Sequence, residues 1–408
     1  MSAPATADFP AERSRRRAER PLAPGSFPTL PILPSRLDPK RLRGALLLAL
    51  LLALLAPCLL AAGTTAASQR QPQHPSSAKL KPKPKPAYWG AWIGDQITGT
   101  GAPWDMNAVA YFEQMLGKGM SLIEFSSPWR DCTRIPCQSY KFPDEAMDNI
   151  RGHGSIPLFS WGSEAAPSTG PEQPDFQLAK IASGALDPYI AQFATEAREW
   201  GHPFFLRFDW EMNGNWFPWS QLANGNEAGQ FVAAWRHVHD VFAAVGATNA
   251  TWVWCPYADT AKRLKKNPLK PLYPGDAYVD WTCLDAYNWG QNAVNPRPWR
   301  SFRELFAPAY TELVKKVAPR KPMMLGEFAT SPNGGHKAAW IRKMFAELPR
   351  RYPRIRALVY FNTVDRGVDW PLETSLPAAR AFAAGIRKNT FASNRFGTLA
   401  GGPILPLR

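Results

Sequence analysis

The sequence has few of the residues that build metal and redox centres. Its 408 residues include six histidines and five cysteines, and these do not recur at a metal-ligand spacing. The histidines are scattered, and His237 and His239 fall on different faces of one predicted helix. We therefore expect no catalytic metal and no cofactor.

The sequence also lacks the glycine-rich phosphate loops of nucleotide-binding proteins. No such loop follows any strand that the sequence predicts, and no segment repeats along the chain. The first absence argues against a dinucleotide-binding sheet and against transfer from a nucleotide sugar. The second argues against a solenoid of stacked repeats.

Acidic residues are scarce at the two ends of the chain, so the net charge of +15 is unevenly distributed. Residues 1–86 hold 14 Lys and Arg against 4 Asp and Glu, and residues 387–408 hold 4 basic and no acidic residues. Subtracting these surpluses of ten and four leaves about +1 for residues 87–386. Because the body is nearly neutral, we expect no nucleic-acid partner.

Residues 44–62 form a long apolar run, GALLLALLLALLAPCLLAA, directly after basic residues. The run is compatible with a signal peptide and with a membrane-spanning anchor, and the sequence leaves both open. Residues 1–43 are predicted as a basic disordered tail. Residues 63–86, which include SSAKLKPKPKP, are typical of an extended Lys/Pro-rich linker. We expect the rest of the chain to be secreted or anchored to the outer face of the cytoplasmic membrane.

The remaining four cysteines fall into two pairs with different interpretations. In an oxidising compartment Cys132 and Cys137 are spaced to close a short loop by a disulfide. Cys255 and Cys283 lie in apolar strand-like segments, where buried free thiols are the expected state. The sequence does not decide whether either pair is bonded.

From residue 87, short apolar segments alternate with amphipathic helical segments. The apolar segments fit parallel strands that are buried on both faces. They lie at 87–93, 121–126, 156–161, 203–209, 251–255, 279–285, 322–328 and 356–362. The clearest helical segments lie at 187–201, 227–246, 302–317, 338–351 and 376–389. Eight strand-then-helix units predict an α/β fold, a single (β/α)8 TIM barrel over 87–388 with an irregular tail at 389–408. An open doubly wound sheet is the alternative.

The segment FFLRFDWEMNGNWFPW ends the fourth predicted strand, where barrel enzymes carry their working residues. Residues two apart share one face of an extended strand, so Arg207, Asp209 and Glu211 are predicted to point into the barrel mouth. Asn213 and Trp216 follow, and a carboxylate among amides and aromatic rings suits a sugar. For Arg207 and Asp209 the alternative is a salt bridge at a strand end.

A second carboxylate, Glu327, ends the apolar segment PMMLGEF. A charged group at the end of a buried strand is costly unless it faces a solvated cavity or a partner. In VDWTCLDAYNWG, Asp285 and Tyr287 alternate to one side, and Trp289 follows. Tyr287 is placed to orient Glu327 across the rim, or alternatively to fill the top of the barrel.

Tryptophan is abundant, with 17 residues, and many lie near predicted strand ends. Rings at strand ends are expected to stack on the apolar faces of sugars. Trp92, Trp161, Trp289 and Trp370 are therefore predicted to orient or bind the substrate. Trp254 is compatible with the core instead.

Two carboxylates at one rim fit glycoside hydrolysis. One must be protonated to donate to the leaving oxygen, and the other must be ionised to attack the anomeric carbon. The apolar, Trp-lined site and a nearby negative charge favour Glu211 as the acid. Arg207 and Tyr287 are placed to hold Glu327 as the nucleophile.

These segments resemble glycoside hydrolase family 26. The resemblance covers nearly all of 87–385 and is carried by RFDWEMNGNWFPW, AWRHVHDVF with ATNATWVWCPY, VDWTCLDAYNWG, LGEF and YFNTVDRGVDW. It implies a retaining barrel with Glu211 as acid/base and Glu327 as nucleophile. It also implies that Tyr287 hydrogen-bonds the nucleophile and that Trp216 and Trp370 line sugar subsites.

The family includes β-1,4-mannanases, β-1,3-1,4-glucanases and β-1,3-xylanases. Many of its mannanases have His directly before the acid/base, where this chain has Trp210. We expect a monomer that hydrolyses β-linked polysaccharide internally, a β-1,4-mannan first and the other two glycans as alternatives. A non-catalytic carbohydrate-binding barrel and an anchored glycosyltransferase-like enzyme are the alternatives of other classes.

Overall fold

The computed structural model describes residues 84–258, 260–292 and 296–408. Within these ranges no helix combines the length and the apolar character that crossing a bilayer requires. The predicted basic tail, the apolar run 44–62 and the linker up to residue 83 lie outside the described residues.

Eight parallel strands close into a barrel. They belong to a nine-stranded sheet ordered β1-β9-β8-β7-β6-β5-β4-β2-β3, in which β3 is a short antiparallel partner of β2. The strands are β1 (Tyr88–Ile93), β2 (Leu122–Asp131), β3 (Gln138–Ser139), β4 (Ile156–Ala166), β5 (Phe204–Phe208), β6 (Ala250–Trp254), β7 (Trp281–Asn288), β8 (Met323–Thr330) and β9 (Ile355–Asn362). Pairing of β1 with β2, Gly90 opposite Leu122, closes the ring. This closure confirms the barrel and excludes the open sheet.

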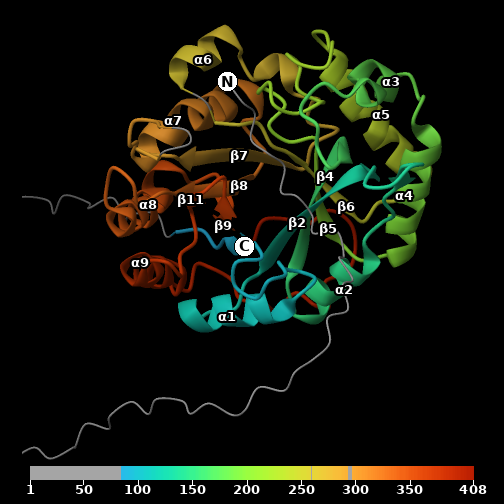
Figure 1. Cartoon of the computed structure of the whole chain (residues 1–408). Helices are drawn as coiled ribbons and strands as arrows, with labels where there is room; N and C mark the ends of the chain where they lie inside the picture. The colour runs from blue at the N-terminus through green and yellow to red at the C-terminus, as the bar shows by residue number, and fades with distance from the viewer. Residues whose placement is uncertain (1–83, 259, 293–295) are drawn as a thin grey trace, which may run out of the picture. The chain divides into compact units, whose positions relative to one another are not determined.

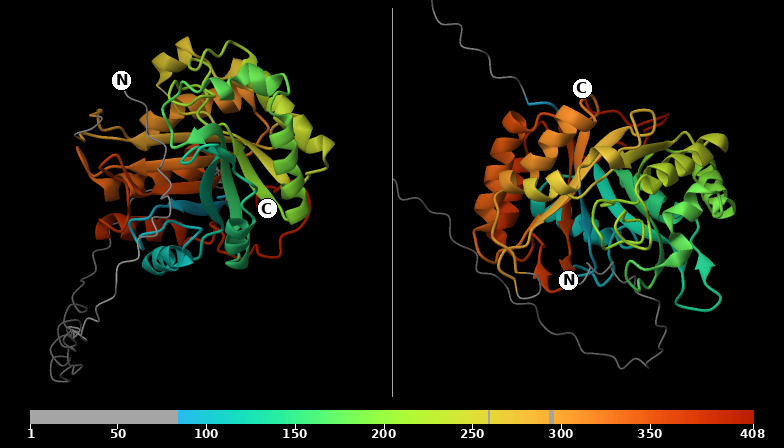
Figure 2. Two further views of the ribbon diagram at one scale, coloured as in Figure 1. Left: turned by 45° about the vertical axis from the view of Figure 1, so that its right-hand side comes forward. Right: turned by 90° about the horizontal axis from the view of Figure 1, so that it is seen from above.

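Helices form a ring around the strands (Figure 1). They are α1 (Met106–Leu116), α2 (Asp144–Gly152), α3 (Leu178–Ala182), α4 (Asp187–Trp200), α5 (Gln230–Ala244), α6 (Ala261–Lys266), α7 (Phe302–Glu312), α8 (Lys337–Arg351) and α9 (Leu376–Ile386). Figure 2 shows from two further sides that they lie outside the strands. A short hairpin of β10 (Val364–Asp365) and β11 (Val368–Asp369) follows β9. All the predicted strands and helices are confirmed, and β2 and β4 extend beyond their predicted ends.

Local sequence sets several helix ends. Ser301 and Glu304 form a capping box that satisfies free backbone N–H groups at the start of α7. Gly117 and Gly201 end α1 and α4 in the left-handed conformation, which glycine adopts without steric cost. These ends set where each helix turns back towards the next strand.

Strand alternation builds two apolar layers. Leu158, Phe205 and Met324 face inwards and fill the barrel, whereas Phe159 and Trp161 face outwards and pack beneath the helices. Each strand is therefore buried on both faces, as the continuous apolar segments predict. The packed interior leaves the rim at the carboxyl ends of the strands as the natural place for polar side chains.

The C-terminal tail closes the opposite end of the barrel, where the strands begin. The Trp281 indole N–H donates to the Ile404 carbonyl at 2.7 Å, and the Ile404 N–H donates to Thr251 Oγ1 at 2.8 Å. The Tyr88 hydroxyl donates to the Leu405 carbonyl at 2.9 Å. Figure 1 places the C-terminus at the centre of the ring of helices. The tail is irregular in backbone, as predicted, but it packs as part of the barrel.

Both cysteine pairs are disulfides. Cys132–Cys137 closes a short loop after β2, in line with one of the predicted alternatives. Cys255–Cys283 joins the residue after β6 to β7 inside the barrel. The expectation of free thiols at Cys255 and Cys283 is wrong, because neighbouring strands bring the two sulfurs together in the core.

Candidate active site

A cluster of charged side chains lies inside the barrel at the carboxyl ends of the strands. Arg207 of β5 is fully buried among three carboxylates. Its Nη1 donates to Glu124 Oε1 of β2 at 2.7 Å and to Glu327 Oε1 of β8 at 2.6 Å, and its Nη2 donates to Asp285 of β7. Parallel strands end at one rim, so residues distant in sequence meet there. Burial alone would lower the pKa of Arg207, but the carboxylates raise it well above its usual value, and it stays charged.

One guanidinium cannot balance three buried carboxylates. Burial raises the pKa of Glu124 well above its usual range and that of Asp285 to about 7. Glu124 Oε2 is buried and accepts no hydrogen bond from the described residues. We therefore place a proton on Glu124 near neutral pH, which leaves the Arg207 charge for Asp285 and Glu327.

Glu327 is held through both its backbone and its side chain. Its N–H donates to Asp285 Oδ1 at 2.7 Å, and the Tyr287 hydroxyl donates to its Oε2. Arg207 binds its other carboxylate oxygen. Burial and then the neighbouring carboxylates raise the pKa of Tyr287 well above its usual value, so the phenol remains a donor. The carboxylate of Glu327 is thus oriented from two sides.

The loop after β5 does not keep the alternation that the sequence predicts. β5 ends at Phe208, and the next residues include two in the left-handed region, Asp209 with φ 42° and Glu211 with φ 54°. Asp209 turns to β4, where its carboxylate accepts hydrogen bonds from the Ser163 N–H and hydroxyl, each at 2.8 Å. The prediction that Asp209 shares a face with Arg207 and Glu211 is wrong, because the backbone leaves the extended conformation.

Glu211 is nevertheless directed towards the charged cluster. Its N–H donates to the Cys255 carbonyl at 2.7 Å, and its Oε2 accepts a hydrogen bond from the Trp216 indole N–H at 2.7 Å. Burial raises the pKa of Glu211 well above its usual range, and the charges of Asp285 and Glu327 add to the rise. Glu211 is therefore a buried carboxylic acid close enough to Glu327 to feel its charge.

Asn213 orients this loop. Its Nδ2 donates to the Tyr257 carbonyl at 2.9 Å, and its Oδ1 accepts the Tyr257 N–H at 2.8 Å. The side-chain amide thus ties the loop after β5 to the segment after β6. Gly214 allows Trp216 to fold back, because a Cβ at Gly214 would lie 2.6 Å from the indole ring.

Aromatic rings gather around Tyr287, the hydrogen-bond donor to Glu327. Trp289 packs edge-on against Trp370 with centroids 5.1 Å apart, and Tyr287 lies 5.5 Å from the same ring. Trp92 packs on Phe361 at 6.2 Å. Trp92 and Trp289 keep exposed surface, whereas Trp370 is fully buried behind Tyr287 and Trp289. Trp370 therefore orients the rings that face the rim and does not present its own.

Trp161 lies away from the rim cavity. It stacks on Phe193 of α4 with centroids 4.3 Å apart, and it also contacts Trp129 and Phe208. The side chain is completely buried. The prediction that Trp161 binds substrate is wrong, because its position in β4 faces the helices and not the barrel mouth.

Arg366 is a candidate that the sequence interpretation missed. It lies in the β10–β11 hairpin with φ 51°, and its buried Nε and Nη2 make no hydrogen bond with the described residues. Burial lowers the pKa of Arg366, while Asp365, whose Oδ1 lies 3.8 Å from Arg366 Nε, and the nearby Glu211 act against that shift. The signal in the sequence is the Arg-Gly pair, which is typical of a tight turn. Glu124 was also not predicted as a site residue, because it lies within an apolar segment of β2 that predicts only a buried strand.

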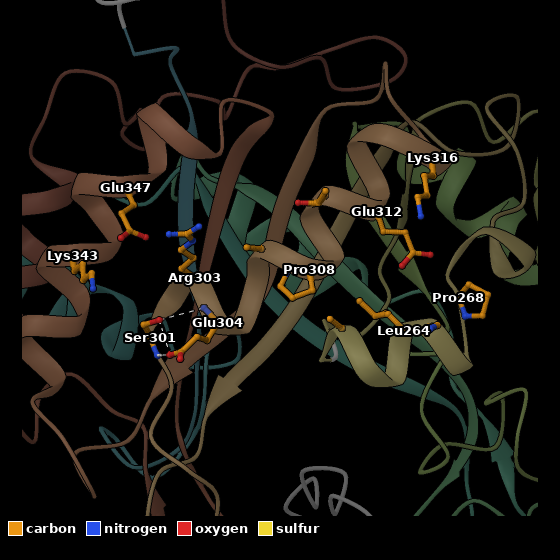
Figure 3. Close-up of a pocket in the computed structure, with 14 residues that line it drawn as sticks. Leu264, Pro268, Ser301, Arg303, Glu304, Pro308, Glu312, Lys316, Lys343 and Glu347 are labelled. Atoms are coloured by element: carbon orange, nitrogen blue, oxygen red, sulfur yellow. Dashed lines mark hydrogen bonds between the residues drawn. The ribbon is translucent and has the colours of Figure 1, made fainter.

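Two other places in the described part of the chain have features of a binding site. Cys255, Cys283 and Asp285 bring potential metal-ligand atoms together, but the two sulfurs are bonded to each other. A groove between α6, α7 and α8 lies on the outside of the barrel, and its lining includes Leu264 and Pro308 (Figure 3). No aromatic side chain lines this groove. The rim, with its acids and rings, is the better candidate.

Comparison with known proteins finds relatives of the barrel that carries this site. Residues 173–330 match the model of glycosyl hydrolase family 26. Endoglucanase H of Acetivibrio thermocellus is 30% identical over 303 residues, which are 73% of this chain and 30% of that protein. A mannan endo-1,4-beta-mannosidase of Bacillus subtilis is 25% identical over 228 residues, 55% of this chain and 54% of that protein. This chain thus spans about a third to a half of these relatives.

The fold is shared with solved structures. A Cellulomonas fimi endo-beta-1,4-mannanase superposes with a TM-score of 0.56 at 17% identity, over 76% of this chain and 72% of the other. The matched segment 173–330 contains Arg207, Glu211, Tyr287 and Glu327, which the structure brings to one rim. The barrel of this chain therefore belongs to glycosyl hydrolase family 26.

Proposed function

We propose that the chain is a retaining endo-β-glycanase with Glu327 as nucleophile and Glu211 as acid/base. The observation that carries the proposal is the contrast between two neighbouring carboxyl groups. Arg207 and Tyr287 donate to the two oxygens of Glu327, while burial raises the pKa of Glu211 well above its usual range. Retaining glycosidases need one ionised and one protonated carboxyl group about 5–5.5 Å apart.

In the first step a Glu327 oxygen attacks the anomeric carbon, and the bond to the leaving oxygen breaks. Glu211 gives its proton to that oxygen, so the shortened glycan leaves as an alcohol and Glu211 becomes a carboxylate. Arg207 and Tyr287 hold the nucleophile in line for this attack. The product is a glycosyl ester on Glu327.

In the second step Glu211 acts as a base. It accepts a proton from a water molecule, whose oxygen attacks the same anomeric carbon and releases Glu327. Two inversions give net retention, and Glu211 is protonated again. The two hydrogen bonds between the Asn213 side chain and the Tyr257 backbone hold the loop that carries Glu211 in place for both roles.

We propose β-1,4-mannan as the first substrate to test. Support comes from the sequence similarity to the mannan endo-1,4-beta-mannosidase of Bacillus subtilis and from the barrel shared with the Cellulomonas fimi endo-beta-1,4-mannanase. The half-buried rings of Trp92 and Trp289 suit stacking on successive sugars.

A β-glucan is the second candidate. Trp210 occupies the position before the proposed acid/base, and the Arg207 guanidinium lies over its ring at 5.0 Å. The similarity to endoglucanase H, which extends over 303 residues, favours the same class. Trp210 is therefore the residue most relevant to the choice between the two glycans.

We propose that the enzyme acts outside the cytoplasmic membrane. The apolar run 44–62 after basic residues supports export, and so do two disulfides in one domain, since disulfides persist in oxidising compartments. Whether residues 44–62 are cleaved or retained as an anchor can be checked by N-terminal sequencing of the exported protein.

The function is tested by reducing-sugar release from mannan, lichenan and β-1,3-xylan. Proton NMR during the first minutes identifies the anomer that is formed. We expect release from one of these glycans, with the β-anomer appearing first. The α-anomer first would contradict retention, and release from none by well-folded protein would favour a non-catalytic carbohydrate-binding barrel.

A further inference from the structure

A buried disulfide lies directly beneath the two proposed catalytic glutamates. Cys255 follows β6 and Cys283 lies in β7, and both side chains are completely buried. The bond links two strands that stand between β5 and β8 in the barrel wall. Glu211 lies in the loop that follows β5, and Glu327 lies within β8.

On the nucleophile side, the disulfide packs against Asp285. The Sγ atoms of Cys255 and Cys283 lie 3.2 Å and 3.7 Å from Asp285 Oδ1. The same oxygen accepts the N–H of Glu327 at 2.7 Å. Sulfur contacts thus limit the movement of the carboxylate that holds the nucleophile's backbone.

Gly326 shows how tight this packing is. A Cβ at Gly326 would lie 2.5 Å from Cys283 Sγ, 2.8 Å from Asp285 Oδ1 and 3.1 Å from Cys255 Sγ. Only a residue without a side chain lets β8 lie against the disulfide here. The glycine that precedes Glu327 is therefore explained by the sulfur atoms behind it.

On the acid side, the contact is through the backbone. The carbonyl oxygen of Cys255 accepts the N–H of Glu211 at 2.7 Å. Glu211 has left-handed backbone geometry, which persists only where the surroundings hold it. One half of the disulfide therefore anchors the acid/base, and both halves support the carboxylate that anchors the nucleophile.

We propose that the Cys255–Cys283 disulfide is a positioning element that holds Glu211 and Glu327 at their working separation. The inference rests on the proposed function, because it assigns these two residues as the catalytic pair. The disulfide touches no substrate and transfers no proton. Its effect is to fix Asp285 and the Cys255 carbonyl, so that neither glutamate drifts from the anomeric carbon.

The first test is whether the bond forms in the full-length chain produced in an oxidising compartment. Proteolysis without reduction, followed by mass spectrometry, should recover the Cys255 and Cys283 peptides as one linked species. Alkylation of both thiols in unreduced protein would overturn the proposal.

The second test compares two double variants, C255A/C283A and C132A/C137A, on the glycan that the wild type hydrolyses. We expect kcat of C255A/C283A to fall about tenfold to a hundredfold with KM nearly unchanged, because an ångström of misplacement costs about that much. C132A/C137A removes a disulfide in a loop and should keep both parameters. Equal loss in both variants, or unchanged kcat in C255A/C283A, would overturn the positioning role.

The third test does not depend on activity. Amide hydrogen exchange should become faster in peptides covering 209–214 and 322–331 when the disulfide is absent, since these contain the anchored N–H groups of Glu211 and Glu327. C132A/C137A should leave both peptides as in the wild type. Unchanged exchange in C255A/C283A would overturn the proposal even if the chain hydrolyses none of the glycans.

If C255A/C283A does not fold, the C132A/C137A chain prepared under reducing and oxidising conditions provides a comparable test. Since this variant lacks the Cys132–Cys137 bond, its two preparations differ at the Cys255–Cys283 bond. Faster exchange at 209–214 and 322–331 and lower kcat in the reduced chain, both reversed by reoxidation, would support the proposal. Identical exchange and kcat in the two preparations would overturn it.

Discussion

The two proposed catalytic glutamates are held by different kinds of structure. Glu327 sits within strand β8, where the pairing with β9 shifts register between Leu325 and Phe328, and side chains from β5 and β7 donate to its carboxylate. Glu211 sits on a loop in left-handed conformation, is held through its backbone N–H, and receives one indole hydrogen bond. A nucleophile needs a fixed, ionised carboxylate, whereas an acid needs a carboxyl group that gives up and regains a proton. The difference in surroundings matches the difference in roles.

Glu327→Ala should have the largest effect, because it removes the atom that forms the covalent bond. We expect kcat to fall by several orders of magnitude while oligosaccharide binding remains. Sodium azide should restore turnover and yield the glycosyl azide of inverted configuration, identified by NMR. Glu164→Gln is the control variant. Glu164 is also buried, and burial raises its pKa to about 8. Its protonated carboxyl group therefore resembles the glutamine amide that replaces it. Near-normal turnover of Glu327→Ala would end its assignment as nucleophile.

Glu211→Ala should come next, with a loss of about 10²–10⁴ in kcat on natural glycan. An aryl glycoside with a good leaving group needs little protonation, so its first step should be largely spared. Azide should again restore turnover, but with the retained configuration, because the glycosyl ester on Glu327 still forms. Equal losses on activated and natural substrates would show that Glu211 is not the acid.

Arg366→Ala tests whether the guanidinium of the β10–β11 hairpin, whose Nε lies 3.8 Å from Asp365 Oδ1, binds sugar. Lost hydrogen bonds from a charged donor should raise KM about tenfold with a small change in kcat. Arg366→Lys, which keeps the charge but not the planar donors, should recover part of the affinity. Isothermal titration with oligosaccharide separates binding from turnover, and unchanged affinity in Arg366→Ala would exclude a sugar contact.

Trp216→Phe should have the smallest effect, a shift in the pH profile. The indole N–H donates to Glu211 Oε2 and stabilises its charged form, so its removal raises the pKa of Glu211 further. Glu211 must be protonated in the first step, and activity is lost as pH rises through that pKa. The alkaline limb of kcat/KM should therefore move to higher pH in the variant. A shift to lower pH would contradict the assignment of this limb to Glu211.

The accuracy of the sequence predictions follows from the range of the interactions involved. Strand positions were predicted well because burial on both faces leaves a continuous apolar segment at each strand. The alternation of Arg207, Asp209 and Glu211 failed, because the backbone turns left-handed after Phe208. Trp161 was misassigned because position at a strand end does not tell which layer a ring enters.

The sequence by itself determined the eight strand-then-helix units and the two glutamates near strand ends, since these follow from local periodicity and motif spacing. Only the tertiary structure decided the closure of the barrel, the burial of Glu124 beside Arg207, the disulfide beneath Asp285 and the place of Arg366. These depend on groups that are distant in sequence and meet through the curvature of the closed sheet. Their energies come from burial and from pairwise distance, and neither quantity is contained in the order of residues.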